Sequence, residues 1–448
     1  MAFTIAQHPT GEAAAAAGTI PLADAAHLLR RVGFGGSAME VQALASSGDW
    51  PTVVEKLLDT SAAPPVNRPP MIDDREQNGY QRWVQATQWW IDRMTTTPAP
   101  LAERMVLFFH NHFVSGTDKV DIALLVKQHD VFRAGGLGDY HALVQQVAVD
   151  PAMLLYLDNA ANVAGKENEN FAREVMELFT MGNFTFAETD VISMARAWTG
   201  HGLDKDRRRY EFHADRHDTG AKTLFGLDRN WDGPAALTEI VTGSKKQVAA
   251  EFLTAKLWSY LAYPRPPAAL VTELANTFIA AKYDLKALVR AMLLHPQFRS
   301  PEARAPMVRS PIEWFVASQK ALQMKAADTH PEWWLSGMGQ QPFLPPNVAG
   351  WKQNGYWLST SAYWSRGAYA GNVRWKARDA GIFADVEDLT PAEAVQAAFD
   401  RFGIVTPDPQ TRQVLEAWVA GERTARRGWA VQANLITLLL LSPDFQVA

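Results

Sequence analysis

Glu174 and Glu177 are the residues of this sequence whose type and spacing best suit chemistry. On a helix that begins near Asn170, both carboxylates fall on one face together with Arg173 and Asn170, opposite an apolar face. Carboxylates held in this way can act as general acid and base or as metal ligands. We therefore predict Glu174, Glu177 and Arg173 as catalytic residues and Asn170 as a substrate-binding residue. The alternative is a solvated helix face on which Arg173 and Glu177 form an ordinary i,i+4 ion pair.

A charged, glycine-containing segment farther along the chain offers a second group of reactive side chains. His217, Asp218 and Lys222 lie close together in a turn-forming context, where backbone groups can also bind a ligand. We predict these three residues as further catalytic residues. The alternative interpretation is a charged surface loop in which the histidine side chain bonds locally.

Histidines in and before this segment could hold a metal ion. His213 lies just before His217, while His110 and His112 lie on an earlier predicted helix. Neutral imidazole combined with carboxylate suits Zn²⁺, Mn²⁺ or Fe²⁺. A divalent metal is therefore the candidate cofactor, with His110, His112 and His213 as its candidate ligands. The alternative for His112 is a core histidine, because it falls inside the apolar arc of its helix.

The segment from Pro345 to Trp357 has the turn chemistry of a lid or a pocket wall. It contains Asn347, Trp351 and Trp357, which we predict to contact a substrate. The sequence has 16 tryptophans, and such rings can stack on sugars, but large helical proteins also use tryptophan simply to fill the core. The alternative is a well-packed structural loop.

Composition and missing motifs exclude several classes of protein. Because the sequence has no cysteine, it has no disulfide, thiolate metal site or cysteine nucleophile. It also lacks a phosphate-binding glycine-rich loop, an HExxH motif and a GxSxG motif, so a nucleotide enzyme, a zincin and an α/β-hydrolase are not predicted. A net charge of -5 argues against an extended nucleic-acid surface, so no nucleic-acid partner is expected.

Hydropathy along the chain indicates whether the protein is inserted in a membrane, secreted or cytoplasmic. The longest strongly apolar run, Leu435 to Leu441, is far shorter than the ~20 residues that a membrane-spanning helix needs, so no membrane span is predicted. Met1 to Thr19 carries an alanine run without a preceding Lys or Arg, which makes it a poor secretory signal. From the sequence alone we therefore expect a soluble, cytoplasmic protein.

The elements that must position the candidate residues are predicted to be helices. Apolar residues recur at helical spacing in stretches such as Pro21 to Val32 and in both parts of Tyr80 to Asp118. No run of alternating strands appears. We therefore predict an all-α fold, a large multi-helix single body, with residues 1–448 forming one helical domain.

Two long loops interrupt the helical pattern, at about residues 203–243 and 340–361. Loops of this length inside a globular chain are usually functional or disordered. Within the first loop, Tyr210 to His213 and Lys222 to Phe225 could form short strands. We expect at most a few such strands in the whole chain.

Six segments resemble the bacterial domain-of-unknown-function 1800 family, and they occur in order over nearly the whole chain. They are AAHLLRRVGFG at Ala25 to Gly35, ERMVLFFHNHFVSG at Glu103 to Gly116, NENFAREVMELFTMG at Asn168 to Gly182, DVISMARAWTG at Asp190 to Gly200, HDTGAKTLFG at His217 to Gly226 and PPNVAGWKQNGYWLSTS at Pro345 to Ser361. The family motifs fall on Arg31, His110, Asn111, His112, Asn170, Arg173, Glu174, Glu177, His217, Asp218 and Lys222. The sequence is identified as a member of this family.

The resemblance implies a single helical body that is periplasmic or exported, which differs from the cytoplasmic location expected from the sequence alone. It also implies a gene neighbourhood with a second uncharacterised family, related to alkaline phosphatases and sulfatases, from which a partner protein could come. Such neighbours would fit the processing of a surface polymer.

Two hypotheses about function follow. The first is a hydrolase-type enzyme that acts on a carbohydrate or another surface polymer and that depends on a metal in one version. The second is a non-catalytic partner or scaffold protein whose polar motifs are structural. Candidate residues that converge on an open pocket would favour the enzyme, and candidate residues satisfied in a closed core would favour the scaffold.

Overall fold

The structure is a computed structural model that describes residues 18–304, 307–425 and 427–448. The alanine run considered above as part of a leader lies in residues 1–17, outside the described residues. In the described ranges, no helix combines the length and the hydropathy needed to cross a bilayer.

Helices dominate the described chain. The first part contains α1 (Leu22–Val32), α2 (Ala38–Ala45), α3 (Trp50–Leu58), α4 (Gly79–Thr96), α5 (Pro100–His112), α6 (Ile122–Gly135), α7 (Tyr140–Ala148), α8 (Pro151–Tyr156) and the short helix η2 (Asn159–Ala161). The middle part contains α9 (Glu169–Glu174), η3 (Val175–Thr180), α10 (Glu188–Ala197), η4 (Ala214–Arg216), α11 (Gly233–Val241), α12 (Lys246–Leu261), α13 (Ala268–Ala280), α14 (Leu285–Leu294) and α15 (Pro301–Arg304). The last part contains α16 (Pro311–Leu322), α17 (Ala326–Thr329), α18 (Pro331–Met338), η6 (Asn354–Trp357), α19 (Thr360–Asp379), α20 (Pro391–Phe402), α21 (Pro409–Thr424), α22 (Val431–Leu441) and α23 (Pro443–Gln446).

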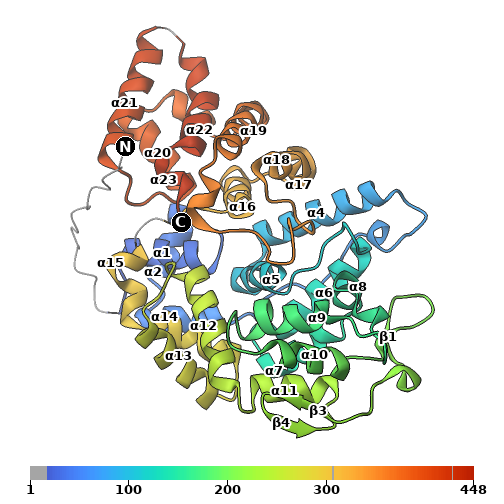
Figure 1. The fold of residues 1–448 in the computed structure, drawn as a ribbon. Coiled ribbons are helices and arrows are strands. Elements are labelled where there is room, and N and C mark those ends of the chain that lie inside the picture. The colour runs from blue at the N-terminus through green and yellow to red at the C-terminus, as the bar shows by residue number, and fades with distance from the viewer. Residues whose placement is uncertain (1–17, 305–306, 426) are drawn as a thin grey trace.

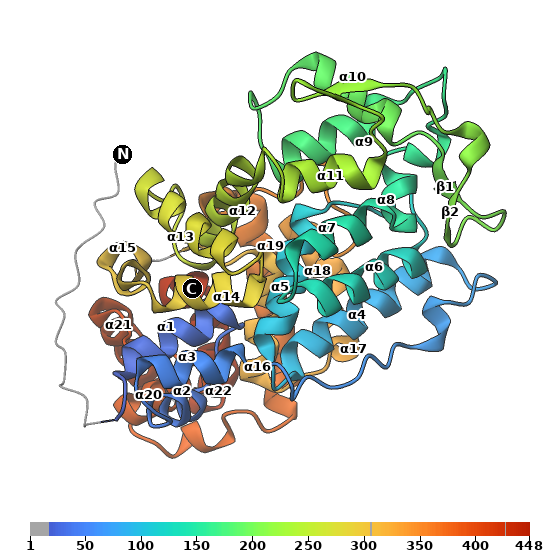
Figure 2. The same cartoon turned by 90° about the horizontal axis from the view of Figure 1, so that it is seen from below.

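The predicted all-α fold is confirmed, and the helices form a single body. Segments far apart in the sequence lie side by side, because α2 packs against α20 and α3 packs against α14. Figures 1 and 2 show α20 and α21 at one end of the molecule and α9, α10 and the short strands at the other. Most of the buried apolar side chains of the described residues belong to one contiguous cluster.

Local sequence signals explain where many of these helices begin. Ser310 caps α16 by accepting a hydrogen bond from the Glu313 backbone N–H, and the Glu313 carboxylate accepts one from the Ser310 N–H in return. Asp150 caps α8 and Asn78 caps α4 in a similar way, each accepting from two backbone N–H groups of the first turn. Such caps satisfy donors that have no partner inside the helix.

The short strands form two separate antiparallel hairpins. β1 (His201–Leu203) pairs with β2 (Tyr210–Phe212), and β3 (Lys222–Leu224) pairs with β4 (Leu227–Arg229). The expectation of at most a few short strands is therefore confirmed. The first long loop is shorter than predicted from the glycine spacing, because α11 already begins at Gly233. Asp232 caps α11 by accepting from the Ala235 N–H at 2.7 Å, and Pro234 lies at the start of the helix.

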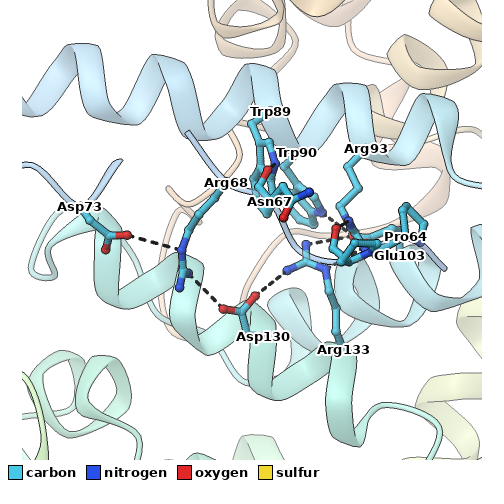
Figure 3. A network of polar contacts seen from close by, with 11 residues as sticks. Pro64, Asn67, Arg68, Asp73, Trp89, Trp90, Arg93, Glu103, Asp130 and Arg133 are labelled. Atoms are coloured by element: carbon cyan, nitrogen blue, oxygen red, sulfur yellow. Dashed lines mark hydrogen bonds and ion pairs between the residues drawn. The ribbon is translucent and has the colours of Figure 1, made fainter. Parts of the chain in front are cut away.

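A buried polar network joins the segment before α4 to three helices (Figure 3). At its centre, Glu103 of α5 accepts hydrogen bonds from Arg93 of α4 at 2.5 Å, from Arg133 of α6 at 2.7 Å and from the Trp90 indole at 3.0 Å. Arg93 also donates to the Pro64 carbonyl at 2.9 Å. The network therefore ties the proline-rich connector to α4, α5 and α6.

Candidate functional site

The predicted Glu174 helix is present, but it changes its winding at the glutamates. Asn168 caps α9 by accepting from the Asn170 N–H at 2.9 Å. After Glu174 the chain continues as η3, which is a π-helix from Val175 to Thr180. Because π-helical turns are rare and are often found at functional sites, this geometry makes the region around Glu174 a candidate functional site.

The carbonyls of the π-helix find partners outside the usual helical ladder. The Thr180 hydroxyl donates to the Val175 carbonyl at 2.5 Å, Lys256 of α12 donates to the Leu178 carbonyl at 3.1 Å, and the Tyr140 hydroxyl donates to the Phe179 carbonyl at 3.2 Å. Burial lowers the pKa of Lys256 to about 8. Tertiary contacts therefore stabilise the unusual turn that carries Glu177.

Glu174 and Glu177 are both half-buried. Within the described residues, neither carboxylate has a hydrogen bond or an ion pair. Burial and the nearby charge of Glu177 raise the pKa of Glu174, and Arg173 opposes this rise. A partly desolvated carboxylic acid beside a second carboxylate is suited to donating a proton.

Two further residues lie near this pair. Tyr156 of α8 is buried, and its pKa is raised to about 12 by burial and by the charges of Asp118 and Glu174. Asp118 is exposed and follows the end of α5. Neither residue is predicted from the sequence, because only the tertiary structure brings Tyr156 within reach of the charges of Asp118 and Glu174. We call Asp118, Tyr156, Glu174 and Glu177 the carboxylate site.

Arg173 and Asn170 bond to different elements around α9. Arg173 donates to Glu188 of α10 at 3.1 Å and to Glu169 at 3.3 Å, so the i,i+4 pair with Glu177 considered above is not formed. Asn170 is exposed, and its side chain donates to the Leu157 carbonyl at 3.3 Å. Arg173 thus joins α9 to α10, and Asn170 joins α9 to the end of α8.

His217, Asp218 and Lys222 lie together beside α10, and their polar atoms bond locally. The His217 Nδ1 atom donates to the Thr199 carbonyl at 2.8 Å, and Asp218 pairs with Arg196 of α10 at 2.7 Å. Lys222 is buried and donates to the carbonyls of Asp218 at 2.6 Å and Gly220 at 2.9 Å. In the described part of the chain, no hydrogen bond or ion pair joins these three side chains to Glu174 or Glu177.

The three candidate metal ligands occupy different surroundings. His110 accepts a hydrogen bond from the Phe343 N–H at 3.2 Å, and burial lowers its pKa to about 3. His112 is buried and stacks on Phe108 with ring centroids 5.6 Å apart, and burial together with the Lys256 charge lowers its pKa. His213 bonds through Nε2 to a strand carbonyl, that of Leu203, at 3.2 Å. Among residues 18–304, 307–425 and 427–448, no three histidine or carboxylate side chains are grouped in the manner of a cation site.

The second long loop is anchored by Asn111, which the sequence analysis placed in a family motif but gave no role. The Asn111 side-chain oxygen accepts from the Trp351 N–H at 2.6 Å, and its amide donates to the Trp351 carbonyl at 3.2 Å. Trp351 and Trp357 are buried and line a cavity of about 40 Å³, which has room for about one water molecule. Asn347 is exposed and accepts from the Ala349 N–H at 2.9 Å.

A large open groove of about 880 Å³ runs along α10 and the β3–β4 hairpin. Its lining includes the aromatic rings of Phe184 and Phe225, the cations Arg196 and Lys245, and the Thr189 and Ser193 side chains. Phe184 is fully exposed. Thr189 follows directly after Glu188, the partner of Arg173, so an ion pair connects α9 to the helix that lines the groove. Asp118, Tyr156, Glu174 and Glu177 are not among the lining residues of the groove.

Comparison with known protein families gives a match over nearly the entire chain. The family model described as "Protein of unknown function (DUF1800)" matches residues 27–447. No curated protein and no solved structure matches the chain significantly. Because the family model covers nearly the entire chain, the protein belongs to the DUF1800 family of proteins of unknown function.

Proposed function

We propose that this protein is a hydrolase-type enzyme that acts on a carbohydrate or another surface polymer, with Glu174 as the general acid and Glu177 as its partner carboxylate. The observation that carries the proposal is the state of these two side chains. They are half-buried and close enough to influence each other electrostatically, and the described residues offer neither one a hydrogen bond. Two half-exposed carboxylates that bond to no group of the described chain are accessible to a ligand, and the raised pKa of Glu174 makes it a candidate acid.

Other features support a polymeric substrate. The groove along α10 is open, and its aromatic and hydroxyl side chains, among them the exposed Phe184 and Thr189, are of the kinds that contact sugars. Arg173 connects α9 to the beginning of α10, beside the groove lining. The proposal requires that a polymer in the groove extend past its lining residues to the carboxylate site on α9 and η3.

The test incubates the purified protein with a panel of bacterial surface polysaccharides and with peptidoglycan. Hydrolysis is measured as the release of new reducing ends. We expect Glu174→Gln to lower the rate on any active substrate by roughly 10²- to 10⁴-fold, the usual contribution of a general acid. The rate of the unmodified enzyme should fall as the pH rises through the raised pKa of Glu174, because the acid must be protonated to donate.

The matched control is Glu169→Gln, which removes a carboxylate from the same helix. Glu169 contacts Arg173, which keeps its stronger contact with Glu188, so we expect a change of only a few-fold. A folded Glu174→Gln protein that retains full turnover would refute the proposed role of Glu174. A metal-dependent version predicts a stoichiometric divalent metal in elemental analysis and a loss of turnover after chelation.

The second candidate function is a non-catalytic partner or scaffold. It is favoured by the way in which His217, Asp218 and Lys222 use their polar atoms to hold their own loop. A partner could come from the neighbouring phosphatase- and sulfatase-like family that the family resemblance implies. Mixing the two purified proteins and measuring a shift in elution volume on size-exclusion chromatography tests this candidate directly.

A further inference from the structure

A pocket that is smaller than the groove along α10 lies at the end of α8. It has a volume of about 200 Å³, and α8, η2, β1 and η4 form its walls. Leu154, Leu155 and Leu203 give it an apolar floor, while Arg207, His213 and Arg216 bring cationic or polar groups to it. We call it the arginine pocket.

The two arginines have no partner for their charge. In the described part of the chain, the guanidinium groups of Arg207 and Arg216 make no hydrogen bond and no ion pair, although their backbones are fixed by hydrogen bonds to Asp204 and His213. The acidic residue of the lining, Asp158, instead pairs with Lys119 at 3.0 Å. The pocket therefore carries an excess of positive charge in a protein whose net charge is -5.

Two residues that line the pocket have an uncommon backbone conformation. Asp158 and Arg207 both have left-handed backbone conformations, with φ of 60° and 55°, and both line the pocket. Such conformations cost free energy in residues with a side chain, and they cluster where the structure serves a ligand.

The position of His213 also depends on a close approach. Its ring lies against Gly202, where a Cβ atom would come within 3.0 Å of the imidazole Cδ2 atom. The Nε2 atom bonds to the Leu203 carbonyl at 3.2 Å, and within the described residues Nδ1 has no partner. The glycine thus permits the ring to form one wall of the pocket with a nitrogen left available.

From these observations we propose that the arginine pocket binds an oxyanion, namely a sulfate, phosphate or carboxylate group. The group is either a free ion or part of a small molecule. Guanidinium groups match the geometry of such anions and form strong charge-assisted hydrogen bonds with them. Because a water molecule occupies about 30 Å³ of liquid, the pocket holds roughly six water molecules, which suits one anionic group with a small apolar part. This site is distinct from the carboxylate site and stands whether or not the protein is a hydrolase.

The experiment titrates the full-length protein with sodium sulfate, sodium phosphate and sodium acetate, at constant ionic strength maintained with sodium chloride. Isothermal titration calorimetry and the thermal unfolding midpoint report binding. We expect a saturable response to at least one of the three anions. A response to sulfate or phosphate indicates a site for a tetrahedral anion, and a response to acetate indicates a site for a planar carboxylate. The double variant Arg207→Gln/Arg216→Gln should bind at least about tenfold more weakly, because two charge-assisted contacts are lost.

The matched control is the double variant Lys205→Gln/Arg209→Gln, which removes the same charge from nearby positions outside the pocket lining. All four residues are exposed, so the two double variants differ in their relation to the pocket and not in exposure. It should bind like the wild type, and so should Glu174→Gln. Equal weakening in both double variants would show a general charge effect and overturn the proposal, as would the absence of saturation with all three anions. Because the Arg207 and Arg216 side chains form no hydrogen bond and no ion pair within the described chain, both double variants should keep the wild-type unfolding midpoint in chloride alone.

Discussion

Lys222 and Glu174 show opposite ways of holding a charged side chain in this protein. Lys222 is buried, and its ammonium group donates to two carbonyls and to the Asn230 side chain at 3.3 Å. Burial lowers the pKa of Lys222, while Asp218 acts in the opposite direction. Glu174 is half-buried without any such partners among the described residues. The surroundings of Lys222 indicate a structural role, and those of Glu174 indicate a group held for a ligand.

This difference gives a prediction for Lys222. We expect Lys222→Met to lower the free energy of unfolding by about 1–3 kcal/mol, because the carbonyls of Asp218 and Gly220 lose their buried donor. Urea denaturation followed by circular dichroism measures the change. Lys205→Met, at an exposed position in the neighbouring loop, should alter the free energy of unfolding by less than about 0.5 kcal/mol. Equal stability of the two variants would contradict the structural role.

At the scale of elements, the π-helix η3 and the loop before α19 are both shaped by contacts from other helices. Lys256 and Tyr140 bond to carbonyls of η3, and Asn111 of α5 clamps the loop at Trp351. Neither arrangement follows from local propensity, because a π-turn and a long irregular loop are both unfavourable in isolation. The elements next to the candidate residues are therefore maintained by their neighbours.

Gly350 provides a test of the clamp. Its φ is 75°, and an added Cβ atom would lie 2.3 Å from the Asn111 side-chain oxygen and 2.8 Å from the Asn111 carbonyl oxygen. We expect Gly350→Ala to lower the free energy of unfolding by roughly 1–3 kcal/mol or more, from backbone strain together with the collision. Chemical denaturation measures it. The matched control is Gly355→Ala in the same loop, where no atom would lie within 4 Å, and this variant should be nearly neutral.

For the whole molecule, the network around Glu103 is the clearest case of distant segments held by charge (Figure 3). Glu103 is 1% exposed, and it receives hydrogen bonds from two arginines and from the Trp90 indole. Burial alone would raise the pKa of Glu103, but Arg133 and Arg93 outweigh it and hold the pKa below its usual value. Loss of this carboxylate would leave the buried guanidinium groups of Arg93 and Arg133 without the anion that both of them pair with.

We therefore predict that Glu103→Gln lowers the free energy of unfolding by about 3–5 kcal/mol, as is typical when one partner of a buried ion pair is removed. Denaturant unfolding at neutral pH measures the change. The control is Glu55→Gln, which breaks a pair with Arg290 that is partly open to solvent and should cost at most about 1 kcal/mol.

The same carboxylate gives a pH dependence with a definite sign. Because its pKa is lower in the folded state, the unfolded chain takes up the proton first as the pH falls below about 4.3. The stabilisation by Glu103 is therefore complete at neutral pH and is lost as the pH falls toward the folded-state pKa. The difference in unfolding free energy between wild type and Glu103→Gln should shrink on acidification, and a constant difference would contradict the assignment.

The sequence by itself determined the helical fold and the positions of most of its elements. Apolar spacing marked α1, α4 and α5, and the two suggested strands appear as β2 and β3. These features depend on residues close together in the chain, so periodicity and capping residues carry the information. The same reasoning placed Glu174 and Glu177 on one polar face.

Only the tertiary structure decided which polar residues have partners. It placed Tyr156 within reach of the charges of Asp118 and Glu174. It also paired Arg173 with Glu188 instead of Glu177, and it bonded the Lys222 ammonium group to carbonyls of its own loop. These outcomes depend on how elements pack that are far apart in sequence, and hydrogen bonds and desolvation are set by that packing. A single sequence lists the charges of a protein, whereas the fold determines which of them are neutralised and which are left for a ligand.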